Sequence, residues 1–230
     1  MNKLLTEFIG TFFLVITIAL SVKQGVPYAP IVIGSVLMCM VYMGGHISGA
    51  HYNPAVTLAV WLRGKIAPNL AVQYMVTQFI GAFCAAAVAY LLMSSKISAT
   101  DPATHTTTTV VTHDWLFVAP GLYRVGFVLV AEILFTFALA LVVLNVATVR
   151  ATAGNSYYGV AIGFTVAVGA ACVGSISGGA FNPAVGLGSN LFAAIMGDNI
   201  VHSWLYIVGP GLGAVLAAVV FKLQHGTTAD

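Results

Sequence analysis

Charged side chains are scarce in this chain. Only 6% of its 230 residues are Asp, Glu, Lys or Arg, whereas 60% are hydrophobic and the mean hydropathy is +0.99. A soluble domain usually carries about a quarter charged residues, so these few cannot cover a surface exposed to water. The composition therefore excludes an ordinary soluble protein and indicates one whose main solvent is lipid.

Basic clusters and paired cysteines are also missing. Eight Lys and Arg against six Asp and Glu give a scattered net charge of +2, too little to indicate a nucleic-acid partner. Cys39, Cys84 and Cys172 lie inside apolar segments without the spacing of metal ligands, so we expect small core residues, no metal site and no cofactor. No small-x-small cleavage motif precedes Lys23, which predicts an uncleaved first span.

Six apolar segments are long enough to cross a membrane, because about 20 helical residues span the roughly 30 Å hydrocarbon core. Two further apolar segments are too short, since a ten-residue helix reaches only about 15 Å. The sequence therefore predicts an all-α membrane protein with six transmembrane helices and two re-entrant half-helices. The long segments are residues 4–22, 29–43, 72–93, 125–148, 157–173 and 204–222, and the short ones are 53–62 and 182–196.

The chain contains one internal repeat. The motif Ile-Ser-Gly followed by Asn-Pro-Ala-Val lies within residues 47–56 and occurs again within residues 176–185. Upstream of these motifs, Glu7 and Glu132 form a further matched pair, and the matches follow the same order in both halves. Such self-similarity indicates that one structural unit is present twice.

Each copy of the repeat holds three long segments and one short one. We therefore expect a single channel-like domain over 1–230, with repeats at about 1–95 and 125–225 and a Thr-rich polar linker at about 94–124. An odd number of crossings inverts the second repeat, so the two half-helices enter from opposite faces and meet near the midplane. Inverted repeats with broken helices at their centre are typical of substrate pathways through membranes.

The loop cations predict an orientation. Positive side chains are more frequent in cytoplasmic loops than in loops on the other side. With the N-terminus inside, five of the eight cations are cytoplasmic, which favours a multi-pass protein of the plasma or inner membrane with both termini in the cytoplasm. The five are Lys3, Arg63, Lys65, Arg150 and Lys222, against Lys23, Lys96 and Arg124 outside.

The two Asn-Pro-Ala motifs have the composition of helix starts. An Asn side-chain oxygen caps the first helical turn, and Pro is favoured at the next position. Two opposed helices would bring two Asn amides and two positive dipole ends together, where water or a hydroxyl can accept and a cation is repelled. One such motif would be an ordinary loop feature, but two matched copies favour a pore. The residues are Asn53, Pro54, Ala55, Asn182, Pro183 and Ala184.

The four residues ahead of each cap, 49–52 and 178–181, are predicted to be extended backbone. Their small side chains would allow a permeating molecule to approach the main chain closely. Their carbonyl groups would then form a ladder of acceptors along the path. The candidate carbonyls are those of Gly49, Ala50, His51, Gly178 and Ala180.

The two motifs, together with Glu7, Glu132, Gln78 and Pro210, resemble the major intrinsic protein family of aquaporins and aquaglyceroporins. The resemblance covers nearly the whole chain, and residues 46–56 are especially similar to the bacterial aquaporin Z group. It implies a right-handed six-helix bundle in the lipid bilayer and passive conduction of water and small neutral solutes. It also implies a homotetramer with one pore per subunit.

The resemblance breaks down at the selectivity filter near the outer mouth. Family members usually have Arg directly after the second Asn-Pro-Ala, where this chain has Val185. The other filter positions correspond to Ile33, Ala170 and Gly179, where the family usually places at least one aromatic residue. We therefore expect a wide apolar filter. It would admit larger neutral solutes, act as a hydrophobic gate by dewetting, be filled by a neighbouring side chain, or leave a leaky water channel.

Four titratable residues have competing interpretations. Glu7 and Glu132 lie in membrane spans, where they either couple transport to protons or, as the resemblance implies, hold backbone N–H groups around the half-helices. His46 is either a pH-sensitive gate or a packing residue, and His51 more simply offers its carbonyl. Ser48 beside His46 lacks an acid partner, so we expect no catalytic residues and no enzyme. A coupled secondary transporter remains the alternative to a passive channel.

Overall fold

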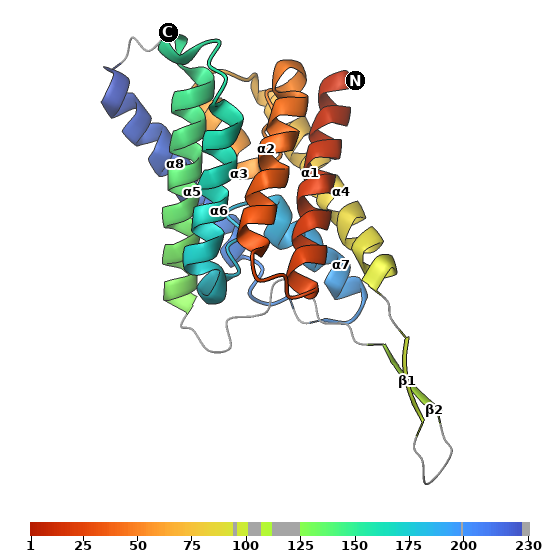
Figure 1. Ribbon diagram of the computed structural model, residues 1–230. Helices are drawn as coiled ribbons and strands as arrows, with labels where there is room; N and C mark the ends of the chain where they lie inside the picture. The colour runs from red at the N-terminus through yellow and green to blue at the C-terminus, as the bar shows by residue number, and fades with distance from the viewer. Residues whose placement is uncertain (94–95, 101–106, 112–124, 199, 227–230) are drawn as a thin grey trace.

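The computed structural model describes the chain except for residues 94–95, 101–106, 112–124, 199 and 227–230. Six of the described helices are long and apolar enough to cross a membrane. Two shorter helical segments reach only part of the way through the bundle (Figure 1). The long helices are α1 (Asn2–Lys23), α2 (Ala29–Ser48), α4 (Pro68–Met93), α5 (Val125–Thr148), α6 (Tyr158–Ser177) and α8 (Leu205–His225), and the short segments are α3 (Pro54–Leu62) and η2 (Ala184–Gly188) continued by α7 (Ser189–Ile195).

All six predicted spans are therefore present, with three changes at their ends. Helix α2 continues beyond the predicted end at residue 43 to Ser48, through Gly44 and Gly45. Helix α6 likewise continues to Ser177. Helix α4 begins earlier than predicted, at Pro68, because Pro is well tolerated in the first turn of a helix.

The two repeats pack in matching ways. Helix α1 packs against α4 in the first repeat, and α5 packs against α8 in the second. Both pairs approach closely at a glycine: a Cβ added at Gly81 would lie 2.9 Å from the Phe8 carbonyl oxygen, and one at Gly213 would lie 2.6 Å from that of Ile133. The repeats meet where α2 crosses α6 at Gly34 and Gly163. Small residues at such crossings bring membrane helices together.

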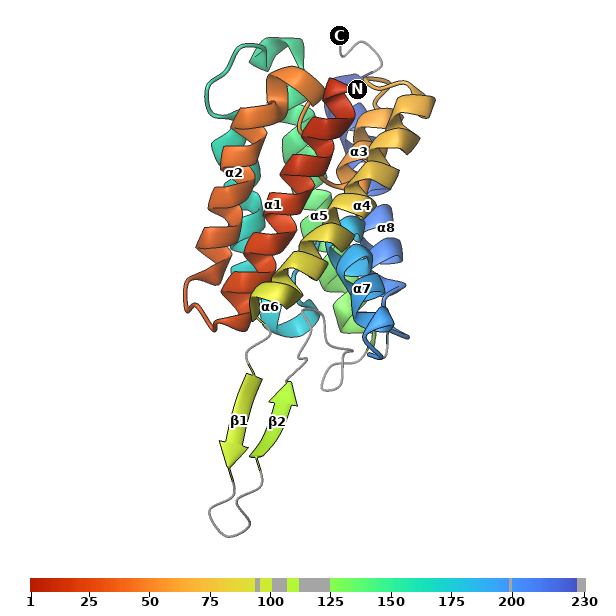
Figure 2. The same cartoon turned by 90° about the vertical axis from the view of Figure 1, so that its right-hand side faces the viewer.

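The half-helices cross between the repeats. Helix α3 packs against α8 of the second repeat, and η2 packs against α4 of the first. Figures 1 and 2 place α3 in the half of the bundle nearer to the two chain ends and α7 in the opposite half. The caps of the two half-helices consequently meet in the middle of the bundle.

The region predicted as a plain linker contains two short strands. Strand β1 (Lys96–Thr100) pairs antiparallel with β2 (Thr107–Val111), and Lys96 lies opposite Val111. The ribbon extends from the end of the bundle opposite to the two termini (Figure 2). The membrane domain is all-α, as predicted, but the sequence interpretation had assigned no structure to this ribbon.

Candidate pore and its lining

The Asn of each Asn-Pro-Ala motif caps its half-helix. The Oδ1 atom accepts a hydrogen bond from the backbone N–H two residues later, at 2.8 Å for Asn53 and 2.9 Å for Asn182. In both repeats it also lies 3.4 Å from the next N–H. Pro54 and Pro183 follow directly, where a missing N–H has no cost. The side-chain oxygens are therefore engaged, and both amide nitrogens point out of their helices.

Each Asn amide also holds the opposite repeat. The Asn53 Nδ2 donates to the Phe181 carbonyl at 2.9 Å, and the Asn182 Nδ2 donates to the Tyr52 carbonyl at 2.9 Å. An amide nitrogen carries two N–H groups. Since both Asn residues also line a central cavity, the second N–H of each can donate to a molecule inside it.

The loop before α3 is turned by Glu7. The Glu7 carboxylate accepts the N–H of His51 at 3.0 Å, the N–H of Tyr52 at 2.7 Å and the hydroxyl of Ser48 at 2.6 Å. The Ser48 hydroxyl in turn accepts the N–H of Ala50 at 3.0 Å. In a trans peptide the N–H and the preceding C=O point in opposite directions. The carbonyls that consequently face away from Glu7 are those of Gly49, Ala50 and His51.

The second loop repeats this arrangement around Glu132. Its carboxylate accepts the N–H of Ala180 at 3.1 Å, the N–H of Phe181 at 2.7 Å and the hydroxyl of Ser177 at 2.7 Å. The Gly179 N–H donates to the Ser177 hydroxyl at 3.1 Å. The carbonyls that face away from the carboxylate are those of Gly178, Gly179 and Ala180.

These two loops are not extended, so that prediction was wrong. In an extended strand successive peptide groups face opposite sides, whereas here three consecutive carbonyls face one side. The backbone achieves this by entering the left-handed region, which non-glycine residues rarely adopt. The φ angles are 92°, 52° and 50° at Gly49, Ala50 and Tyr52, and 84°, 65° and 48° at Gly178, Gly179 and Phe181.

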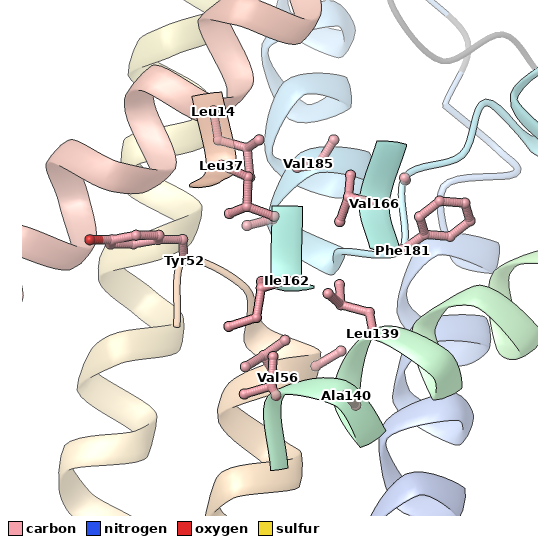
Figure 3. Close-up of a cluster of buried hydrophobic side chains, with 14 of the residues drawn as sticks. Leu14, Leu37, Tyr52, Val56, Leu139, Ala140, Ile162, Val166, Phe181 and Val185 are labelled. Carbon is pink, nitrogen blue, oxygen red and sulfur yellow. The ribbon is translucent and has the colours of Figure 1, made fainter. Parts of the chain in front are cut away.

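One cavity of about 290 Å³ adjoins both Asn caps and extends away from the chain ends. Its wall includes all four positions that the resemblance assigned to the filter: Ile33, Ala170, Gly179 and Val185. None of the described residues that line it is Asp, Glu, Lys or Arg. Figure 3 shows the apolar side chains from α1, α2, α5 and α6 that surround this centre.

Two of the positions that the resemblance assigned to the filter, Ala170 and Gly179, lie close together. A Cβ added at Gly179 would lie 3.3 Å from the Cα of Ala170 and 3.5 Å from the Cα of Gly174, one turn further along α6. The Phe181 ring, which comes from the same loop, packs on Phe135 with ring centroids 5.4 Å apart. The aromatic residues among the described cavity lining, His51 and Tyr52, belong to the loop at the central cap.

A second cavity of about 590 Å³ continues toward the chain ends. It shares Ala50, Val143 and Ile162 with the first cavity, so these residues lie where the two meet. His46 lies in its wall and is exposed. His46 is not among the residues shared by the two cavities, and its role as a gate stays a prediction.

Sequence reasoning missed two tyrosines that support the loops. The Tyr74 hydroxyl donates to the Ser48 carbonyl, and the Tyr206 hydroxyl donates to the Ser177 carbonyl, each at 2.8 Å. The two residues occupy matched positions upstream of Gly81 and Gly213 in the two repeats. That match was a signal in the sequence, although nothing in it indicated the partner of either hydroxyl.

A model of the family described as major intrinsic protein matches residues 1–221. The chain belongs to the major intrinsic protein family. It is accordingly a multi-pass membrane channel that passively conducts water and small solutes, and it is not an enzyme. Family membership thus favours the passive channel over the coupled transporter.

Individual relatives agree with this assignment. The chain is 33% identical over 238 residues to aquaporin NIP1-1 of Zea mays, covering 98% of this chain and 76% of the relative. It is 34% identical over 228 residues to glycerol uptake facilitator protein-like 6 of Lactiplantibacillus plantarum, covering 97% and 98%. Its fold is similar to the X-ray structure of the aquaglyceroporin from Plasmodium falciparum, with a TM-score of 0.80, 21% identity and coverage of 96% and 95%.

Proposed function

We propose that this channel conducts neutral solutes larger than water, of the size of glycerol or urea, through the two cavities and past the paired Asn caps. The observation that carries the proposal is the cavity of about 290 Å³ on the side away from the chain ends (the outer cavity). Ile33, Ala170, Gly179 and Val185 share its wall, and none of the four has a charged or aromatic side chain. A guanidinium at the last position would bring up to five N–H donors and a permanent charge into this space. Valine brings neither.

The path offers a polar side as well as an apolar one. The carbonyls of residues 49–51 and 178–180 accept hydrogen bonds, and the second N–H groups of Asn53 and Asn182 donate them. Apolar side chains such as Leu37 and Val166 line the rest of the outer cavity. A small polyol, with hydroxyls on one side and CH groups on the other, suits this combination. The relative from Lactiplantibacillus plantarum, described as glycerol uptake facilitator protein-like, supports the same solute class.

The test is Val185→Arg, with Val185→Leu as the control that adds volume without charge. Stopped-flow light scattering on proteoliposomes compares water flux with glycerol and urea flux for the parent and both variants. We expect Val185→Arg to lower glycerol and urea flux more than water flux, and Val185→Leu to have the smaller effect. A parent that conducts water alone, unchanged by Val185→Arg, would overturn the proposal. A parent that conducts neither water nor solutes would favour a hydrophobic gate.

We also propose that the chain ends lie in the cytoplasm, in a plasma or inner membrane. Both ends lie on one side of the bundle and the β ribbon on the other (Figure 1), which agrees with an even number of crossings. The test places single cysteines at Thr107 and Gly226 in a background without native cysteine. An impermeant thiol reagent on intact cells should label position 107 alone, and labelling of position 226 alone would invert the orientation.

A homotetramer with one path per subunit completes the proposal. The cavities lie within one chain, while large apolar side chains such as Phe13, Ile31 and Phe164 are about half exposed on the outside of the bundle. Such faces can contact either lipid or a second copy. Native mass spectrometry in mild detergent should give four copies, and a monomer that retains full flux in liposomes would contradict this.

A further inference from the structure

Charged side chains are distributed unequally along the path. The outer cavity has no charged side chain among its described lining residues. The cavity of about 590 Å³ on the side of the chain ends (the inner cavity) is lined by Lys65, Arg150 and His46. Lys3 lies in an adjoining cavity of about 350 Å³, which shares Lys65 and Gly49 with the inner one. No carboxylate lines either inner cavity in the part of the chain that the structure describes. The charged side chains among the described residues that line the two inner cavities are therefore all cations.

Backbone contacts fix the positions of Lys65 and Arg150 at the mouth of the inner cavity. Lys65 comes after the C-cap Arg63 and Gly64 at the end of α3, and its N–H donates to the Val60 carbonyl at 3.1 Å, which ties it to the half-helix. Arg150 opens the short turn η1 (Arg150–Thr152) after α5. The Thr152 hydroxyl anchors this turn by donating to the Asn145 carbonyl at 2.8 Å. Both side chains are exposed to the water of the vestibule.

We propose that Lys65 and Arg150 form the principal electrostatic barrier to cations in this channel, at the inner mouth instead of the outer filter. The proposal rests on the proposed function, since it assumes the two-cavity path and a filter without charge at Val185. A cleft lined by charges of one sign between low-dielectric walls concentrates their field. A ring of Lys and Arg side chains accordingly repels cations and leaves neutral solutes unaffected.

The half-helix termini supply only part of the barrier. Each amounts to about half a positive charge at the central caps. Two full charges at the inner mouth therefore exceed the two central termini in total. A cation arriving from the chain-end side meets Lys65 and Arg150 first, and one arriving from the other side meets them last.

The same cations also agree with a purely topological role, because positive residues gather on cytoplasmic loops. Lys222 distinguishes the two interpretations. It lies near the end of α8, on the side of the chain ends, and lines neither inner cavity. Neutralising Lys222 removes one unit of charge from that face without changing the vestibule, which makes Lys222→Gln the matched control.

The experiment measures potassium influx and water flux in the same proteoliposomes. We expect Lys65→Gln and Arg150→Gln each to raise potassium influx by roughly 3- to 10-fold, as a Coulomb interaction over several ångströms in a hydrated mouth implies. The double variant should leak most, with its water flux unchanged. Lys222→Gln should alter neither quantity, and the charge-preserving pair Lys65→Arg with Arg150→Lys should keep the barrier.

Ionic strength provides a test that needs no substitution. The Debye length falls from about 30 Å at 0.01 M to about 3 Å at 1 M, so exposed charges are screened strongly by salt. At constant potassium, an impermeant organic salt should raise potassium influx through the parent channel and have less effect on the double variant. A parent whose leak does not respond to salt would overturn the proposal, even if the double variant failed to fold.

The two proposals fail separately. A double variant with normal water flux and potassium influx no greater than that of the parent would overturn the cationic barrier. Its glycerol and urea flux would be unaffected, so the proposed solute class would stand. Conversely, absent glycerol and urea flux in the parent would overturn the solute class while the potassium comparison still tested the barrier.

Discussion

The two half-helices occupy equivalent places but are held by different means. In the first repeat, Gln78 donates to Glu7 at 2.7 Å and to the Thr57 hydroxyl at 3.1 Å, and Thr57 donates to the Asn53 carbonyl at 3.0 Å. The His51 ring joins this network at 3.1 Å from Thr57. A chain of buried polar groups therefore fastens α3 to α1 and α4.

In the second repeat, the positions that correspond to these polar side chains hold residues that have no polar side-chain group. The counterparts of Gln78, Thr57 and His51 are Pro210, Gly186 and Ala180. Glycines bring the second half-helix into direct contact instead: a Cβ added at Gly186 would overlap the Tyr206 side chain, and one at Gly188 would lie 2.6 Å from the Cβ of Ala82. The two copies of the repeat therefore hold equivalent half-helices differently, by hydrogen bonds in the first copy and by close packing in the second.

Backbone regularity follows the same division. Helix α3 is an α-helix from its first residue, while the second half-helix begins with the π turn η2. Single π turns inside helices are rare and frequently occur at functional sites. Here the π turn contains Val185, which the resemblance assigns to the filter, and the packed Gly186. The closely packed half-helix therefore has the irregular backbone, and the hydrogen-bonded half-helix has the regular one.

Replacing each buried carboxylate by glutamine should give the largest difference in stability between the two repeats. Each oxygen of Glu7 accepts two donors, so an NH₂ on either side disturbs two hydrogen bonds, although the Ser48 hydroxyl can turn to accept. Among the described residues, one oxygen of Glu132 accepts only the Phe181 N–H, so a glutamine there confronts one donor. We expect Glu7→Gln to cost about 2–4 kcal/mol and Glu132→Gln about half of that, since buried unpaired donors carry this cost. Thermal unfolding in detergent, followed by size exclusion, gives the order, and equal losses would contradict it.

Adding a methyl group tests the packed half-helix. Gly186→Ala forces the new Cβ into Tyr206, and overpacking of this kind costs about 1–3 kcal/mol. Because Tyr206 supports the second loop, we also expect a change in the ratio of glycerol to water flux. The matched control is Gly211→Ala on α8, where no atom lies within 4 Å of an added Cβ. An intact protein after Gly186→Ala would show that packing does not hold this half.

Removing one hydroxyl tests the hydrogen-bonded half-helix. Thr57→Val keeps the volume but leaves the Asn53 carbonyl and the His51 ring without that partner. We expect a loss of about 1–2 kcal/mol from the unmade bonds, and nearly full recovery in Thr57→Ser, which restores the hydroxyl. The same unfolding assay measures both variants. Equal stability of Thr57→Val and the parent would remove the proposed difference between the repeats.

The central caps should give the most symmetrical effect on stability. Asn53→Ala and Asn182→Ala each delete one cap, worth about 1 kcal/mol, and one bond to the other repeat. We expect closely similar shifts in unfolding temperature and reduced flux of water and glycerol in both. Asn53→Asp should lower neutral flux further, because it places a charge without N–H donors between two positive helix ends. Alanine variants that conduct like the parent would contradict a role for these amides in conduction.

Periodicity and repetition predicted the architecture well. The six spans, the two half-helices and the inverted repeat follow from the lengths of apolar segments and from matched motifs. The filter residues were assigned by motif spacing, and the structure places Ile33 and Ala170 in the same cavity wall as Gly179 and Val185. The spans could be predicted because they depend on distances along one chain segment, which helix geometry converts directly into positions, whereas the role of these four residues as a filter stays a prediction.

What the sequence did not predict depends on contacts between distant segments. The left-handed loop at Gly49 and Ala50 exists because Glu7 draws successive N–H groups to one side, and no local propensity indicates that. The π turn depends on the closeness of Tyr206, which lies in another helix. The extension of α2 to Ser48 crosses Gly44, which the Tyr52 side chain packs against. In each case tertiary contact outweighed local preference.

The exchanged hydrogen bonds at the centre make each repeat incomplete without the other. Asn53 has its acceptor at Phe181, and Asn182 has its acceptor at Tyr52, so each tip exposes one donor and one acceptor until its counterpart arrives. Unpaired polar groups at this depth in a membrane are costly. We therefore expect the tip of the first repeat to be completed only after the second repeat has been inserted. Two separate polypeptides divided within the 94–124 segment should accordingly rebuild a conducting channel together, and neither should conduct alone.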